Sequence, residues 1–314
     1  MKKSILAFAV LGAFAGAASA QSSVTIYGKL NLEVGKAAGS ADKALMDVAG
    51  SRLGFRGVED LGGGMKATFG IEHRFVPQTG AANANFWNGY STVGLQGGFG
   101  WVRLGRDYTP AFLMIQNQID PFGGDTVAAL RDIGMRGQGG TTRVRASNMV
   151  EYHIGMSGFN LGAQIAEAAP NGGPKRPFSI AANYAAGPLF VGAGLENPAG
   201  LDDQHFSVGA RYNFGFMTAS AGFHKGTTNK AANGKTSDTK GFLLAASVPV
   251  GAGAVRGGYA QSTLGDADAQ KKVSIGYRHD LSKRTYLFAD LARVNDVISR
   301  TEKTGYDFGL QHNF

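Results

Sequence analysis

Apolar and polar residues alternate with a period of two along most of the chain. Over 24–33 the even positions are apolar or glycine, whereas the odd positions hold Thr, Tyr, Lys, Asn and Glu. The segment 306–314 repeats this alternation, and so do 52–57, 66–74, 206–213 and 272–278. A period of two places successive side chains on opposite faces of a strand, and helical spacing is hard to find after residue 24. The pattern predicts an all-β chain.

Turn signals of two kinds separate these segments. Short signals, rich in glycine, fall at 60–64, 96–100, 157–159, 186–188, 213–215, 249–253 and 280–283. Longer and more polar connections fall at 35–50, 76–85, 108–146, 167–177, 196–204, 226–238, 262–270 and 295–303. Seven short and eight long connections join sixteen strands. Because the two kinds alternate, the short connections lie at one end of the strands and the long ones at the other. Strands of about ten residues with short turns at one end and long loops at the other predict an outer-membrane antiparallel β-barrel.

A soluble β-sandwich also produces alternating strands, with one face in the core and the other in water. Sixteen strands exceed an ordinary sandwich, however, and closure into a barrel removes every sheet edge. Gly, Ser, Asn, Thr, Arg and Lys are frequent on the polar face, which fits a water-filled lumen, and the chain ends on an aromatic strand with Phe314. These three features favour the membrane barrel.

The first twenty residues have the layout of an export signal. Lys2 and Lys3 precede an apolar run from Ile5, and small residues end at Ala20 before the polar Gln21. A buried N-terminal helix is the alternative, but the polar residues that follow at once argue against it. The sequence therefore predicts a cleaved signal peptide over 1–20 and a single barrel over 21–314.

Composition removes several other classes of protein. Cysteine is absent, which excludes disulfides, thiol nucleophiles and cysteine-zinc sites. The 48 glycines in 314 residues are about twice the usual share of about 7%. After residue 20 no apolar run approaches the roughly 18 residues of a transmembrane helix. The formal charge of +8, which falls to +6 without Lys2 and Lys3, would suggest nucleic acid in a cytoplasmic protein, but export weakens that interpretation.

Several motifs spread over the chain resemble one family. They are the segments 23–28, SVTIYG, 51–67, SRLGFRGVEDLGGGMKA, 102–110, VRLGRDYTP, 145–152, RASNMVEY, and 277–285, YRHDLSKRT, together with the terminal Phe314. With these motifs the chain resembles the general porins of Gram-negative outer membranes, in particular their β-proteobacterial branch. The resemblance implies a sixteen-stranded barrel, a homotrimer, passive diffusion of small hydrophilic solutes, and a third loop folded into the lumen.

The connection 108–146 is the third long one and the longest, as that resemblance requires. Its apolar residues, among them Ile115, Ile119 and Leu130, argue against disorder and predict packing on a wall. It also contains three acids that we expect at the pore constriction: Asp120, Asp125 and Asp132.

Strand parity predicts which charged side chains face the lumen, because a charge on the lipid face costs roughly 2 to 4 kcal/mol near the bilayer midplane. The predicted inward bases are Lys29, Arg52, Arg56, Lys66, Arg74, Arg103, Arg145, Arg211, Arg256, Lys272 and Arg278. The inward acids are fewer: Glu33, Glu72, Glu151, Asp290 and Asp307. Such an excess of positive charge favours permeation by anions.

We expect Arg52, Arg74 and Arg145, with Arg56 beside them, to form the basic wall of the constriction. Arg52 and Arg145 lie in motifs whose arginines line the narrowest point of similar anion-selective porins. The chain departs from that pattern at 87–90, WNGY, where similar porins tend to carry basic residues. For each arginine, a solvated place near the rim or pairing with Glu72 or Glu151 is an equally good interpretation.

An enzymatic function finds little support in the sequence. The six histidines lack metal-ligand spacing, the glycine clusters lack the context of a phosphate loop, and no G-x-S-x-G is present. We therefore expect no catalysis, no cofactor, no metal and no nucleic acid. The expected partners are two further copies of the chain, outer-membrane lipid and lipopolysaccharide, and small hydrophilic solutes and anions. The alternative function is a plugged barrel with a structural, adhesive or rim-enzyme role.

Overall fold

β-Strands make up nearly all the regular structure of the chain. The computed structural model describes residues 22–137, 142–168, 175–198, 203–228, 236–266, 270–295 and 303–314. The predicted signal peptide, 1–20, lies outside these residues. Sixteen long strands are β1 (Ser23–Lys36), β3 (Arg52–Gly62), β4 (Met65–Val76), β6 (Tyr90–Gly97), β7 (Gly100–Tyr108), β8 (Arg145–Met156), β9 (Phe159–Ala166), β10 (Phe178–Ala186), β11 (Leu189–Asn197), β12 (Gln204–Asn213), β13 (Thr218–Thr227), β14 (Asp238–Val250), β15 (Gly253–Leu264), β16 (Gln270–Asp280), β17 (Thr285–Asn295) and β18 (Thr304–Asn313).

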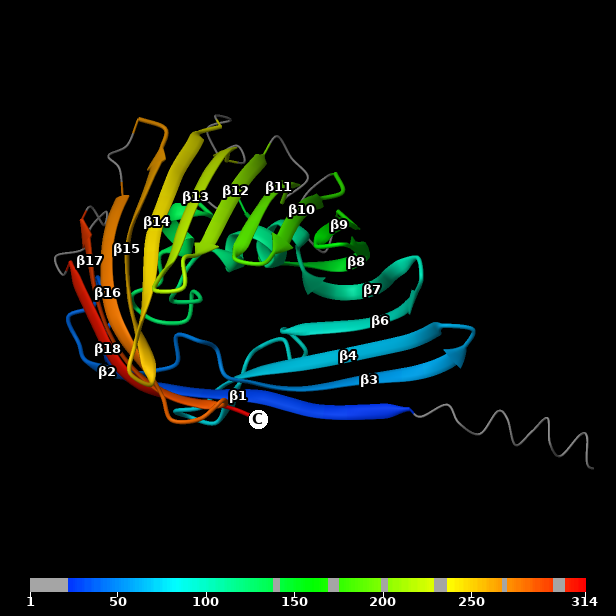
Figure 1. Cartoon of the computed structure of the whole chain (residues 1–314), viewed down its shortest axis with the longest axis horizontal. Helices are drawn as coiled ribbons and strands as arrows, with labels where there is room; N and C mark the ends of the chain where they lie inside the picture. Colours follow the sequence, from blue (N-terminus) through cyan, green and yellow to red (C-terminus); the bar gives the residue numbers. More distant parts are fainter. Residues whose placement is uncertain are drawn as a thin grey trace, which may run out of the picture.

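These sixteen strands form one antiparallel barrel, in which each strand pairs with its neighbours in sequence. The barrel closes where β1 pairs with β18, from Lys29 opposite Asn313 to Lys36 opposite Tyr306. Figure 1 shows the C-terminus beside β1. The sixteen-strand barrel, with short and long connections at opposite ends, is confirmed. Two short strands were not predicted: β2 (Ala44–Met46) pairs with β1, and β5 (Ala81–Ala82) pairs with β4.

The two faces of the wall differ as the alternation predicts. On β1, Ile26, Leu30 and Val34 are exposed on the outer face, whereas Lys29 and Glu33 on the inner face are buried. Large apolar side chains thus cover the outside and polar ones line the inside, which is the arrangement of a barrel in lipid. No helix in the described parts of the chain has the length and hydropathy to cross a membrane.

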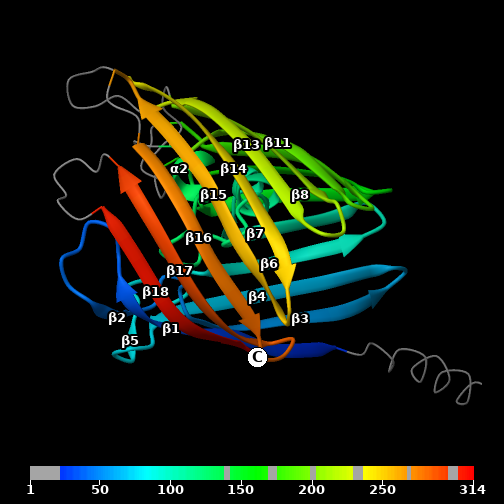
Figure 2. The ribbon, with the colours of Figure 1, turned by 60° about the vertical axis from the view of Figure 1, so that its left-hand side comes forward.

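The longest connection, residues 109–144 and here called loop 3, folds into the barrel over its described parts, 109–137 and 142–144. These parts contain three short helical turns, η2 (Ala111–Ile115), η3 (Gln116–Gln118) and α2 (Arg131–Gly134). In Figures 1 and 2 these turns lie on the concave side of β10–β15, within the curve of the sheet. The predicted inward third loop is confirmed, and it divides the lumen unequally.

The closure is tight at Gly28, whose backbone exchanges hydrogen bonds of 3.0 and 3.1 Å with Phe314. A Cβ at Gly28 would meet the Phe314 ring and lie 2.6 Å from the carbonyl oxygen of Arg52. We expect Gly28→Ala to lower the free energy of unfolding by about 1 to 3 kcal/mol, because small-to-large changes in packed sites cause such losses. The temperature at which the folded band disappears from detergent gels gives the unfolding midpoint, which should fall in this variant.

Gly98→Ala is the matched control, since a Cβ there would have no atom within 4 Å. Equal unfolding midpoints for the two variants would contradict this role of Gly28.

Candidate functional site

Apolar packing anchors loop 3 to one side of the barrel. Ile115, Ile119, Leu130 and Met135 of the loop are fully buried in a cluster with inner residues of β10, β11, β14 and β15. Glycines on the inner wall make room for this contact. A Cβ at Gly209, for example, would lie 2.5 Å from the side chain of Ile119. The loop therefore rests directly on the backbone of the wall.

Hydrogen bonds to charged wall residues hold the same loop in register. Arg211 donates to the carbonyl of Gln118 at 2.7 Å, and Asp307 accepts the N–H of Val127 at 2.8 Å. Arg256 forms an ion pair of 3.0 Å with Asp290. Its guanidinium also donates to the carbonyl of Pro121 and lies over the ring of Phe122. Arg211 and Arg256, predicted as lumen bases, therefore position the loop.

A buried polar layer lies behind the loop, between it and the wall. Gln116 donates to the carboxylate of Glu196 at 3.2 Å, and His224 contacts the carbonyl of Gly134 at 2.9 Å. His205 stacks near His224, and within the described residues neither of its ring nitrogens has a hydrogen-bond partner. Glu196 and His224 contact the loop, and all four side chains are buried, so this layer supports the loop's position.

Asp120 organises the interior of loop 3. Its carboxylate accepts three backbone hydrogen bonds, from Phe122 at 2.9 Å, Leu130 at 2.7 Å and Arg131 at 2.9 Å. Burial raises the pKa of Asp120 above its ordinary value, and these three donors act in the opposite direction. Although we expected Asp120 opposite the arginine wall, the structure places it inside the loop, 6% exposed.

Three predicted arginines of the wall converge through shared acceptors. Arg52 and Arg74 both donate to the carbonyl oxygen of Gly50, at 3.1 and 3.4 Å. Arg74 and Arg145 both donate to the hydroxyl oxygen of Tyr108, the former at 2.7 Å. We call Arg52, Arg74 and Arg145 the arginine cluster. Arg52 and Arg74 lie opposite each other on the neighbouring strands β3 and β4, and Arg145 comes from the more distant strand β8. Together these strands bring three guanidinium groups to one side of the lumen.

Acids only partly balance this cluster. Glu72 pairs with Arg74 at 3.2 Å. No carboxylate lies within ion-pair distance of Arg52 or Arg145 among the residues that the structure describes. Since these two groups carry their charge without an acidic partner, the local field is positive.

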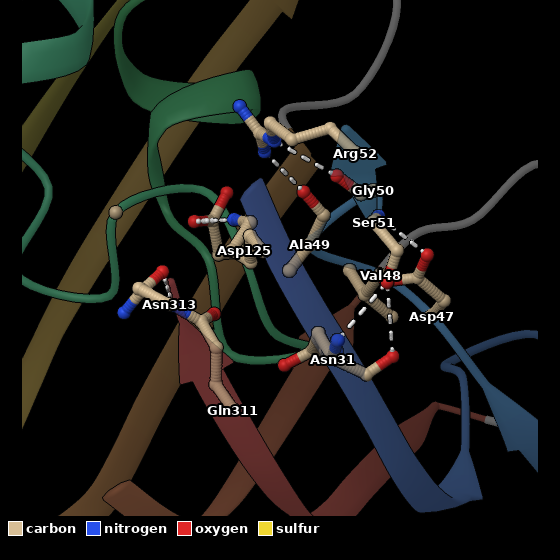
Figure 3. A network of polar contacts seen from close by, with 12 residues as sticks. Asn31, Asp47, Val48, Ala49, Gly50, Ser51, Arg52, Asp125, Gln311 and Asn313 are labelled. Atoms are coloured by element: carbon tan, nitrogen blue, oxygen red, sulfur yellow. Dashed lines mark hydrogen bonds and ion pairs between the residues drawn. The ribbon is translucent and has the colours of Figure 1, made fainter. Parts of the chain in front are cut away.

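A tether connects loop 3 to the wall beside the cluster. Lys29 of β1 forms an ion pair of 2.9 Å with Asp125 of the loop, and Figure 3 shows Asp125 against β1 with Arg52 nearby. To the right of it in Figure 3, Ser51 accepts the N–H of Asn31 at 3.0 Å and donates its own N–H to Asp47 at 2.6 Å. These bonds fix the turn that carries Gly50 and Arg52. Asp125 is therefore a loop acid that faces a wall base.

Three tyrosines shape this region, and the sequence does not predict the role of one of them. Tyr108 lies in the VRLGRDYTP segment, and nothing in that segment indicates that its hydroxyl accepts hydrogen bonds from two arginines. The hydroxyl of Tyr27 contacts that of Tyr90 and donates to Glu72 at 3.2 Å, so both tyrosines face the lumen, as their parity predicts. Period-two parity assigns a side of the wall, but it gives no partner across the lumen.

A backbone irregularity near Arg145 explains why parity is a weak guide there. The β7–β8 register shifts between Gly105 and Asp107, and Asn148 adopts φ of 50°. An inserted residue reverses which face the following side chains take. Arg145 nevertheless reaches the lumen because it is the first residue of β8, where its side chain stacks on Tyr108.

The remaining predicted residues are dispersed. Arg56 lies over the ring of Tyr27, Arg103 pairs with Asp107 at 3.3 Å, and Arg278 pairs with Asp280 at 2.6 Å. Lys272 borders a small cavity near loop 3, and Lys66 is exposed near a short turn. Asp132 pairs with Arg131 and Arg136 inside the loop. None of these contacts joins the arginine cluster.

Comparisons with known proteins agree with this architecture. The Gram-negative porin family model matches residues 7–298. Outer membrane porin protein 32 of Delftia acidovorans is 35% identical, and the major outer membrane protein P.IB of Neisseria lactamica is 27% identical, in alignments that cover all of each chain. The solved structure of an anion-selective porin from Comamonas acidovorans superposes with a TM-score of 0.80 at 30% identity, over 94% of this chain and all of that one.

The position of Asp120 predicts that its replacement opens loop 3. In Asp120→Asn an amide N–H₂ faces backbone donors, and an unmatched buried donor costs about 1 to 3 kcal/mol. We expect trypsin to cleave the refolded protein within loop 3 at least about fivefold faster, since cleavage follows the population of the opened loop. Asp132→Asn, in the same loop but more than half exposed, is the control. Equal cleavage rates would show that Asp120 does not hold the loop.

Proposed function

Because this chain belongs to the Gram-negative porin family, we propose that its diffusion channel favours anions through a constriction lined by Arg52, Arg74 and Arg145. The protein is an integral barrel of the outer membrane and forms a channel for small hydrophilic solutes. The convergence of the three guanidinium groups around Gly50 and Tyr108 is the observation that carries the proposal.

The mechanism is electrostatic. A small anion that enters from the side of the long loops meets the arginine cluster on the wall and the Lys29–Asp125 ion pair at the edge of loop 3. Bases on a pore wall lower the barrier for anions and raise it for cations. Because Arg52 and Arg145 lack acidic partners in the described chain, most of this field comes from them. The similar porin from Comamonas acidovorans is anion-selective, which supports the same preference here.

The other predicted site residues, among them Arg56, Asp125 and the remaining lumen bases, contribute less to the anion preference than the arginine cluster does. Arg56 lies farther from the long loops than the cluster and continues the positive surface. Arg211 and Arg256 hold loop 3 at the width that makes the cluster effective. We assign Asp120 and Asp132 to the loop's own structure.

We also propose that residues 1–20 are a cleaved export signal and that the barrel of 21–314 assembles as a homotrimer in lipid and lipopolysaccharide. Exposed apolar side chains on the outer face of β1 and β18, such as Ile26, Leu30 and Phe308, support contact with lipid or with neighbouring copies. Transport is passive in this proposal, without catalysis or a cofactor.

Reversal potentials in a planar bilayer under a tenfold KCl gradient test the charge preference. We expect wild-type pores to favour chloride, and Arg52→Ala or Arg145→Ala to lower the chloride-to-potassium permeability ratio about twofold each. One charge at about 10 Å in water contributes about 0.4 kcal/mol, which is that factor. The preference should shrink in molar salt, where the Debye length falls to about 3 Å.

Lys225→Ala, which removes an exposed charge from the outer-face parity of β13, is the matched control and should leave the ratio unchanged. A cation-selective wild-type pore, or identical ratios in all the variants, would refute the arginine constriction.

The trimer is tested on gels without heating. We expect a band near three times the mass of the barrel in mild detergent, which collapses to the monomer on boiling. Chemical cross-linking of native membranes is the independent measurement. A monomer under both conditions would contradict the assembly without affecting the charge preference.

A further inference from the structure

A cavity of about 280 Å³ lies in the lumen wall, on the short-turn side of the arginine cluster. β3 runs from the long loops to the short turns, so Arg56 lies four residues, or about 13 Å, beyond Arg52. The lining includes Arg56 of β3, Tyr90 and Thr92 of β6, Arg103 and Tyr108 of β7, and Leu113 of loop 3. A solute that passes the cluster meets this cavity next.

The cavity has a net charge of one positive unit. Arg103 forms its ion pair with Asp107, which also lines the cavity and is buried. Arg56 has no hydrogen bond or ion pair with any described residue, and its guanidinium carbon lies 5.3 Å from the centre of the Tyr27 ring. Since the Asp107 carboxylate offsets Arg103, one free guanidinium remains. A monoanion matches this charge better than a dianion does.

The cavity is also partly apolar, which is unusual for a lumen site. Leu113 is 40% exposed and is the only large apolar side chain that is exposed in the described part of loop 3, since most of the others pack on the wall. The ring of Tyr108 stacks on Phe112, and the Tyr90 ring lies on the lumen face of β6. An exposed leucine beside two tyrosine rings offers a surface for an apolar or aromatic group.

From this combination we propose that the cavity binds aromatic monocarboxylates of the size of benzoate. The carboxylate accepts hydrogen bonds from the Arg56 guanidinium, a strong and directional arrangement. The ring lies against Leu113 and the tyrosines. Acetate offers the same charge without the ring, and phosphate offers charge without an apolar face. The site therefore discriminates among anions that the arginine cluster admits, and this inference rests on the proposed anion channel.

Single-channel currents with benzoate, acetate or phosphate added to the short-turn side test the inference. Benzoate should interrupt the current at lower concentration than acetate or phosphate does. Arg56→Gln should weaken benzoate block by at least about tenfold, the effect of losing one hydrogen bond to a charged group. Leu113→Asn should weaken it about fivefold by removing apolar contact, with acetate little changed.

Lys66→Gln removes another lumen charge on β4, outside the cavity, and is the matched control. It should leave the ratio of benzoate to acetate affinity unchanged, whereas Arg56→Gln and Leu113→Asn should lower that ratio. Reversal potentials in KCl, measured on the same pores, give the anion preference separately. Equal affinity for benzoate and acetate in an anion-selective wild-type pore, or equal effects of Lys66→Gln and Arg56→Gln, would overturn this site alone.

Discussion

Closure of the sheet between β1 and β18 is the constraint on which the rest of the structure depends. A bilayer offers no water to unpaired backbone groups, so a spanning sheet must satisfy every N–H and C=O within itself. The last residue completes this closure, because Phe314 exchanges backbone hydrogen bonds with Gly28 and its ring covers that glycine. Once the sheet is closed, the alternation of side chains fixes which residues contact lipid and which contact water.

Closure of sixteen strands also leaves a wide interior, which loop 3 partly fills. The interior of a sixteen-stranded barrel is too wide for wall side chains to fill, as the water-filled channels of porins show. In this chain the larger buried apolar cluster lies between loop 3 and β10–β15, and only a small one lies within the wall, on β8 and β9. Each fully buried side chain of this kind contributes about 1.5 to 3 kcal/mol. The open part of the lumen is therefore displaced toward β1 and β3–β8, where the arginine cluster lies.

The sequence was informative where local physics decides the structure. Period two predicted the strands, glycine-rich segments predicted the short turns, and the apolar content of 108–146 predicted a loop packed on a wall. It was uninformative about contacts between side chains that are far apart in the sequence. Nothing local to Asp120 distinguishes an acid inside the loop from one facing the wall, and nothing local to Tyr108 identifies its arginine partners on β4 and β8. The register shift near Asn148 has no signal in a pattern that assumes unbroken alternation.

The residues that anchor loop 3 to the wall are different from the residues that face passing solutes. Ile115, Ile119 and Leu130 hold one side of it against the wall, whereas Asp125 and Leu113 lie on the side that faces the open lumen. Since the anchoring energy comes from residues that solutes never meet, the lumen-facing positions can change without loss of the fold. Wall bases act over several ångströms through their field, but an exposed leucine acts only on contact. In the proposed channel, loop 3 thus sets the pore width with one side and the chemical preference with the other.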